Sequence, residues 1–171
     1  DTSSYRAALR SALREAPDVI LVGEIRDRET METALELCNT GHLCLSTLHA
    51  NNANQAMERV INLFPQSLHQ QLFLDLSLNV RAVISQRLVQ GIDGFRVAAI
   101  EVMLNTPHIA DLIFKGQVGS IKEAMEGSGA KGMQTFDAAL FALYKDERID
   151  LEEALSNADS RTNLEARVNF G

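Results

Sequence analysis

The chain has 171 residues, of which 46% are hydrophobic and 23% charged, so it can bury the core of one domain or of one compact unit with an appendage. Its net charge of −7 and its pI of about 5.1 argue against nucleic acid as the main partner, because phosphate binding needs a basic face. No apolar run approaches the roughly 20 residues that span a bilayer, so any membrane contact is expected to be peripheral. Two cysteines without a disulfide framework fit a reducing compartment.

The first fifty residues alternate between helical and strand-like patterns. Apolar residues recur at helical spacing in two segments and form nearly continuous runs in two others: a helix at 5–16, a strand at 18–23, a helix at 31–40 and a strand at 42–49. Pro17 ends the first helix, because proline disfavours helical geometry in the residue before it, and Gly41 caps the second. This alternation is typical of a parallel sheet with right-handed crossovers.

The strand at 18–23 ends in an unusual group of charges. Residues 19–22 are all aliphatic and do not alternate with polar ones, so we expect a strand that is buried on both faces. Gly23 lets the chain leave the sheet, and Glu24, Arg26 and Asp27 follow at the carboxyl end of the strand. Ligands bind at that edge in open α/β sheets. We therefore expect Glu24 to handle a metal ion or a water molecule there.

The rest of the chain predicts a hairpin and a series of short helices. Two strands at 80–89 and 95–104 flank a turn at 91–94, which is typical of a hairpin. Helices are expected on either side of it, at 53–64, 67–78, 107–115, 120–125, 136–143 and 151–159. Residues 1–104 are thus predicted to form the main α/β unit and 105–159 a helical subdomain. Residues 160–171 have little apolar content and are expected to be a loose tail.

His49 is predicted to lie near Glu24, because it ends the next strand along the chain. A polar side chain at this edge, with Thr47 beside it, could report whether a γ-phosphate is present. Simpler alternatives stay open: a surface salt bridge of Glu24 with Arg26 or Arg28, and a structural role for His49.

Cys38, His42, Cys44 and His49 also suggest a zinc site at first sight. Strand geometry argues against it, because His42 and Cys44 share one face of their strand and His49 has the opposite parity. Paired C-x-x-C spacing is missing too. We therefore predict no zinc site built from protein side chains alone.

A glycine cluster at 127–132 has the GxxxxG spacing of a phosphate-binding loop. Met133 and Gln134 stand where such a loop needs Lys and Ser or Thr, and no buried strand precedes it, so we expect a flexible connector. The chain therefore carries a candidate catalytic carboxylate without a phosphate cradle. Either it binds no nucleotide, or the cradle lies upstream of Asp1.

Two segments carry a family resemblance. Asp18-Val-Ile-Leu-Val-Gly-Glu-Ile-Arg-Asp27 resembles the Walker B segment of the secretion-superfamily ATPases, and residues 41–53 resemble their histidine box. Residues 81–86 and 132–137 resemble later segments, so the similarity covers nearly the whole chain. It is strongest to the type IV pilus retraction ATPases of the PilT/PilU branch.

The resemblance implies an α/β fold, namely part of a RecA-like ATPase core with a mostly parallel sheet flanked by helices, a hairpin and a helical C-terminal appendage. It implies a homo-hexameric motor that hydrolyses ATP with Mg²⁺ and powers pilus retraction in twitching motility. The motor would be cytoplasmic and peripheral to the inner membrane. The implied partners are a PilT-like motor, the inner-membrane platform protein and the pilin machinery.

The resemblance also assigns residues. Glu24 becomes the Walker B glutamate, His42 and His49 the histidine-box pair, and Arg26 and Thr47 further contacts to Mg-ATP. In the family, a PAS-like domain, the Walker A loop and an acidic Asp box precede this segment, so the chain alone is expected to be inactive. Whether Glu24 or the Asp box supplies the general base stays open.

Two departures bear on the branch. No cysteine follows Cys44, whereas assembly-type relatives carry a four-cysteine motif, and Ala110 and Phe114 stand where motors of the PilT kind have arginines. This favours a PilU-like protein that assists or depends on a PilT-like motor. The alternatives are a non-catalytic oligomerisation or regulatory module, and a type II secretion or DNA-transfer relative.

Overall fold

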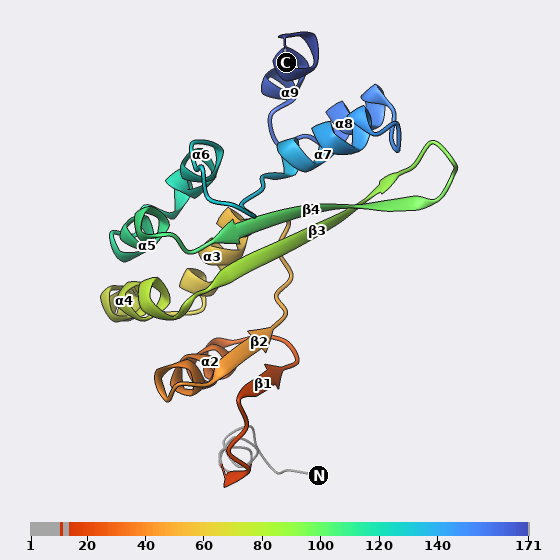
Figure 1. The fold of residues 1–171 in the computed structure, drawn as a ribbon. Helices are drawn as coiled ribbons and strands as arrows, with labels where there is room; N and C mark the ends of the chain where they lie inside the picture. Colours follow the sequence, from red (N-terminus) through yellow and green to blue (C-terminus); the bar gives the residue numbers. More distant parts are fainter. Residues whose placement is uncertain (1–10, 12–13, 171) are drawn as a thin grey trace.

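The computed structural model describes Ser11 and residues 14–170, and the helix expected at 5–16 lies largely outside these residues. Two small sheets organise the described chain (Figure 1). The first pairs β1 (Val19–Val22) with β2 (Leu43–Ser46), and the second pairs β3 (Ala82–Gln90) with β4 (Arg96–Leu104). The helices are α2 (Arg28–Asn39), α3 (Ala53–Asn62), α4 (His69–Asn79), α5 (Pro107–Phe114), α6 (Ile121–Glu126), α7 (Phe136–Lys145), α8 (Leu151–Asn157) and α9 (Arg161–Phe170), with 3₁₀ turns η1 (Gln66–Leu68) and η2 (Val118–Ser120).

The first sheet has the predicted parallel pairing, with α2 as its crossover. Val19 pairs with Leu43 and Val22 with Ser46, so the two strands end at the same level. Asp27 begins α2, since its carboxylate accepts the Thr30 N–H at 2.9 Å. β2 ends three residues before His49, because its partner strand ends at Val22 and leaves no further ladder position.

The prediction that β1 is buried on both faces is wrong for the described chain. Val22 is buried, but Leu21 is 72% exposed, and Val19, Leu43 and Leu45 are exposed with it. A run of aliphatic residues favours two covered faces, but cover depends on the elements that pack on each face. Among the described elements, α2 packs against this sheet and covers one face.

The predicted hairpin of β3 and β4 is confirmed. It is the long element beside which the helices that follow the first sheet lie (Figure 1). A first core cluster contains side chains of helices α2, α3, α4, α5 and α6 and of the end of β4. Its members come from both sides of position 104, the expected boundary of the main α/β unit: Leu35, Met57, Leu76, Met103, Ile109 and Ile121 are among them. A second cluster joins the other end of the hairpin to α7, α8 and α9: Val89, Ala99, Phe136, Leu140, Ile149 and Leu164 are among its members.

Side-chain caps begin three of the C-terminal helices. The Thr106 hydroxyl accepts the Ile109 N–H at the start of α5, and Thr135 and Asp150 cap α7 and α8 in the same way. Among the described residues, no helix has the length and apolar content needed to cross a membrane.

The expected loose tail is instead helix α9. Low apolar content suggested that residues 160–171 could not bury enough surface to order. Two side chains dock it: Leu164 is buried in the second cluster, and the Arg167 guanidinium lies 4.9 Å from the centre of the Phe141 ring. A salt bridge between Arg161 and Glu165 lies on the exposed side.

Replacement of Leu164 by Ala should lower the free energy of unfolding by about 2–4 kcal/mol, because it leaves a cavity between α9, α7 and α8. Chemical denaturation of residues 1–171 measures the change. Thr162→Ala, an exposed substitution on the same helix, serves as the control and should change the free energy by less than about 0.5 kcal/mol. Equal values for the two variants would show that α9 does not dock.

Candidate functional site at the carboxyl ends of β1 and β2

The segments that follow β1 and β2 lie side by side, as the parallel pairing requires. The Ile25 N–H donates to the Thr47 carbonyl at 2.9 Å, and the Thr47 hydroxyl donates to the Gly23 carbonyl at 2.7 Å. These two bonds continue the contact between the strands after the regular ladder has stopped. They fix the backbone beside the polar residues Glu24 and His49.

Glu24 and His49 are brought together at this edge. Oε1 of Glu24 lies 3.1 Å from Nε2 of His49, and Oε2 accepts a hydrogen bond from Nε of Arg26 at 2.6 Å. The Glu24 side chain is 25% exposed, whereas that of His49 is 84% exposed. The ion pair with Arg26, considered above as a simpler alternative, therefore exists together with the contact to His49.

The Glu24 carboxyl group is ionised at neutral pH. The hydrogen bond from Arg26 is the main reason that its pKa lies below the ordinary value, and His49 acts in the same direction while partial burial opposes it. These contacts are accordingly present at neutral pH and are lost as the pH falls through the lowered pKa of Glu24.

Asp27 lies beside this pair but serves α2. The Thr30 N–H and hydroxyl both donate to its carboxylate, at 2.9 and 3.0 Å, and these bonds lower the pKa of Asp27. The start of α2 is thereby locked next to Glu24. Asp27 therefore anchors the start of α2 beside the site through one of its two carboxylate oxygens.

The site is a polar depression of about 620 Å³ between the two strand ends and the start of α2. Its lining consists of Gly23, Glu24, Arg26, Asp27, Glu29, Thr30, Thr47 and His49. The donor set fits Mg²⁺ in part, because this ion binds one or two protein carboxylates and takes its other ligands from phosphate and water. Four of the five predicted site residues line this one depression.

His42 is the predicted residue that the structure does not bring to the site. It precedes β2 at the opposite end of the strand, where Nδ1 lies 3.0 Å from the Thr40 hydroxyl oxygen and 3.3 Å from the Leu37 carbonyl oxygen. These contacts join the end of α2 to the start of β2. In this arrangement His42 holds the crossover and does not contact Glu24.

Cys38 and Cys44 lie close together on α2 and β2. Burial raises the pKa of the Cys44 thiol to about 11, with a smaller contribution from Cys38, so the thiol is protonated at neutral pH. Across the part of the chain that the structure describes, no group of three or more His, Cys, Asp or Glu side chains could hold a metal ion.

The glycine cluster at 127–132 connects α6 to α7 and follows a helix. Phosphate-binding loops follow a strand and carry a Lys directly after the second glycine of the motif. This cluster follows a helix, and Met133 occupies that Lys position. The cluster therefore offers no cradle for a triphosphate.

Sequence reasoning missed three charged residues that hold the backbone behind His49. Arg59 donates to the His49 carbonyl, Arg87 to the Asn51 carbonyl at 3.3 Å, and Glu101 accepts the Ala53 N–H at 2.7 Å. Glu101 had a signal, because it occupies an inward position of β4 in the same alternation as the buried Val97, Ala99 and Met103. The two arginines had none, because contacts to backbone carbonyls, and the Arg87 contact to Asp159 far along the chain, leave no local sequence pattern.

The parallel pair, its crossover helix and the acidic group at the strand ends define an α/β domain with a candidate ligand site at its sheet edge. Residues 2–135 match the family model described as type II/IV secretion system protein, and the chain belongs to this family.

Relatives within the family agree with the resemblance to the PilT/PilU branch. The chain is 54% identical over 172 aligned residues to the type IV pilus ATPase PilU of Pseudomonas aeruginosa, covering 100% of the chain and 45% of PilU. It is 44% identical over 164 residues to the retraction ATPase PilT of the same organism, covering 96% of the chain and 48% of PilT. The higher identity to PilU agrees with the departures at Ala110 and Phe114.

A solved structure supports the fold. The crystal structure of the pilus retraction motor PilT with bound ADP matches with a TM-score of 0.85 and 41% identity, covering 96% of the chain and 46% of PilT. The predicted RecA-like architecture is consistent with this match. The chain spans about half the length of the curated relatives it matches.

Replacement of Arg26 by Ala should raise the pKa of Glu24 toward its ordinary value, because the substitution removes the main cause of the shift. Carboxyl-carbon NMR titration of labelled glutamate measures the change. Arg28→Ala is the matched control, since Arg28 pairs with Glu32 and not with Glu24. An unchanged Glu24 titration in Arg26→Ala would contradict the assignment of cause.

Proposed function

We propose that this chain is part of an ATP-hydrolysing motor of the type IV pilus and that Glu24 and His49 form half of its active site. The observation that carries the proposal is the meeting of an ionised carboxylate and an exposed imidazole, 3.1 Å apart, at the carboxyl edge of two parallel strands. The similarity to PilU and PilT supports the choice of reaction.

In this proposal Glu24 binds the metal ion or the water molecule that takes part in ATP hydrolysis. Its carboxylate lies in the depression and is held in one orientation by Arg26 and His49. A bound Mg²⁺ would supply charge neutralisation between the phosphate groups. Glu24 would hold the coordinated or attacking water, and an acid elsewhere in the intact protein is the alternative general base.

His49 is proposed as the γ-phosphate sensor. Its side chain is exposed on one side and contacts Glu24 on the other, so a phosphate group placed in the depression would compete for it. Thr47 fixes the backbone through the Gly23 carbonyl and lines the same depression, and Arg26 adds positive charge. His42, the other residue of the histidine box, supports the crossover from a distance.

The rest of the assembly is proposed by similarity. We infer a homo-hexamer on the cytoplasmic side of the inner membrane that works with a PilT-like motor and the platform protein to remove pilin subunits during twitching motility. Within it, residues 1–104 would form the C-terminal portion of the ATPase core and the helices from 105 the C-terminal subdomain. The identity to PilU favours the assisting role.

Replacement of Glu24 by Gln in the intact protein should lower kcat for ATP hydrolysis by about 10²-fold or more, because the amide is a poor base and a weaker metal ligand. Glu32→Gln is the control: Glu32 is on α2, pairs with Arg28 and should leave the rate unchanged. A wild-type rate for Glu24→Gln would favour the non-catalytic module, a reading that the engagement of both Glu24 oxygens also allows.

Residues 1–171 alone should show no tight binding of Mg-ATP in titration calorimetry. The reason is chemical: Met133 follows the glycine cluster at 127–132 at the position where a phosphate-binding loop needs Lys, so among the described residues this candidate loop cannot cradle the phosphates. The intact protein is the positive control. Micromolar binding to the 171-residue chain would place the phosphate site within it and contradict this account.

A further inference from the structure

The segment that carries His49 into α3 has no ladder of its own. Residues 47–52 lie between β2 and α3 without regular secondary structure. Side chains from other elements hold this segment, namely Arg59 of α3, Arg87 of β3 and Glu101 of β4. Besides the bonds of Thr47 to the segment after β1, the position of His49 therefore depends on elements outside the parallel sheet.

Arg87 makes the longest connection. One nitrogen, Nη2, lies 3.3 Å from the Asn51 carbonyl oxygen and 2.6 Å from Oδ1 of Asp159, and Nη1 donates to the Asn157 carbonyl at 2.9 Å. The guanidinium also lies 4.0 Å from the centre of the Phe136 ring. A planar group with several fixed donors suits such a junction, and it joins the His49 segment to the chain between α8 and α9.

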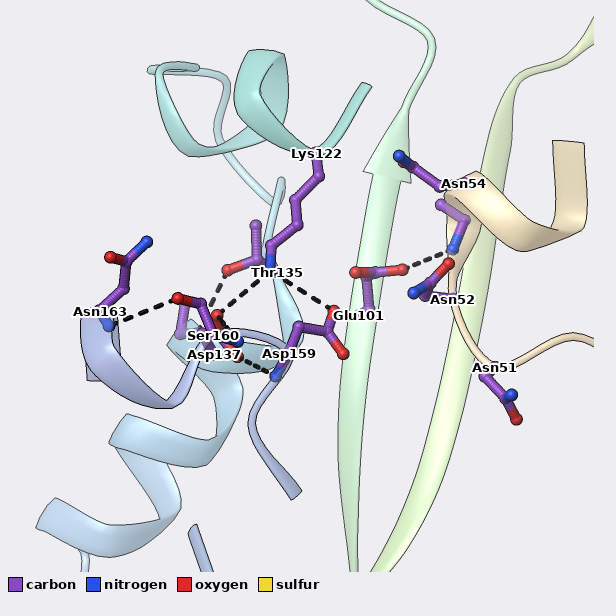
Figure 2. A network of polar contacts seen from close by, with 12 residues as sticks. Asn51, Asn52, Asn54, Glu101, Lys122, Thr135, Asp137, Asp159, Ser160 and Asn163 are labelled. Atoms are coloured by element: carbon purple, nitrogen blue, oxygen red, sulfur yellow. Dashed lines mark hydrogen bonds and ion pairs between the residues drawn. The ribbon is translucent and has the colours of Figure 1, made fainter. Parts of the chain in front are cut away.

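The far side of this junction is itself fixed. The Asp137 carboxylate accepts the backbone N–H groups of Asp159 and Ser160, at 2.7 and 3.2 Å, and Lys122 lies within 3.7 Å of both carboxylates. Figure 2 shows this network of Lys122, Asp137, Asp159 and Ser160 to one side of β4, and Glu101 on β4 itself with its carboxylate bonded toward the start of α3. Arg87 thus binds a segment, residues 157–159, that other side chains already hold in place.

Glu101 secures the other end of the segment. It is 2% exposed and accepts the Ala53 N–H at 2.7 Å, as Figure 2 shows at the start of α3. Burial raises the pKa of Glu101, and the N–H groups of Ala53 and Phe136 oppose the shift. A buried carboxylate that faces two helix starts links α3 to α7 across the hairpin.

We propose that Arg87 is a positioning residue for His49, which it holds in reach of Glu24 by tying Asn51 to the C-terminal segment at 157–159. The inference rests on the proposed function of His49. Asn51 is two residues from His49, so loosening it displaces an imidazole that must stay about 3 Å from its partner, and small misplacements of this kind are costly in active sites.

A double-mutant cycle on kcat of the intact protein tests the proposal. Arg87→Ala should lower kcat about tenfold, with KM for ATP changed less than about threefold, and should have no further effect in a His49→Ala background. A residue that only stabilises the fold would lower kcat by the same factor in both backgrounds. That additive result, or a wild-type kcat for Arg87→Ala, would overturn the proposal.

A second measurement does not depend on turnover. Hydrogen exchange at the amides of residues 50–53 should become at least tenfold faster in Arg87→Ala without nucleotide, while Arg96→Ala should leave it unchanged. Arg96 is the matched control, because it lies on β4 and its side chain bonds only weakly to the Leu88 carbonyl, at 3.4 Å. Unchanged exchange in Arg87→Ala would refute the tether.

Arg87→Lys keeps the test decisive if the alanine variant does not fold. Lysine retains the charge beside Asp159 but lacks the fork that reaches Asn51 and Asn157 together, so kcat should still fall and the fall should still disappear in the His49→Ala background. The two proposals fail separately. A wild-type kcat for His49→Ala removes the sensor and the inference with it, whereas a low kcat for His49→Ala with a wild-type kcat for Arg87→Lys removes only the inference.

Discussion

The parallel pairing of β1 with β2 is the constraint on which the candidate site depends. Since Val22 pairs with Ser46, the two chains leave the sheet at the same level, and the polar residues that follow each strand must share one edge. The Glu24–His49 contact follows from this register. A slip of one residue would turn the side chains of one strand to the opposite face and separate the pair.

The sequence was sufficient for this part of the site because strand periodicity and topology rules act locally. Glu24 and His49 each follow a strand, and the crossover rule places the two strand ends together. The hairpin turn was predicted for the same reason, because a few neighbouring residues decide it. The caps at Thr106, Thr135 and Asp150 are local in the same sense.

Features that depend on distant partners could not be predicted. Whether β1 is covered on both faces depends on which elements pack against it, and the composition of the strand does not determine this. Helix α9 forms around one buried side chain, Leu164, whose partners lie on other helices. Arg87 donates to the Asn157 carbonyl, 70 residues away, and no local sequence pattern predicts such a contact. His42 was grouped with His49 by motif, yet it lies at the other end of β2.

The open face of the first sheet reverses the usual meaning of a core mutation. Leu21, Val19, Leu43 and Leu45 lie between 46 and 72% exposed, so a polar residue at Leu21 removes little buried surface from the described chain. The same change in a strand covered on both sides is among the most damaging. The tolerance of position 21 to serine or threonine is thus a direct measure of how well this face is shielded from water in any assembly that contains the chain.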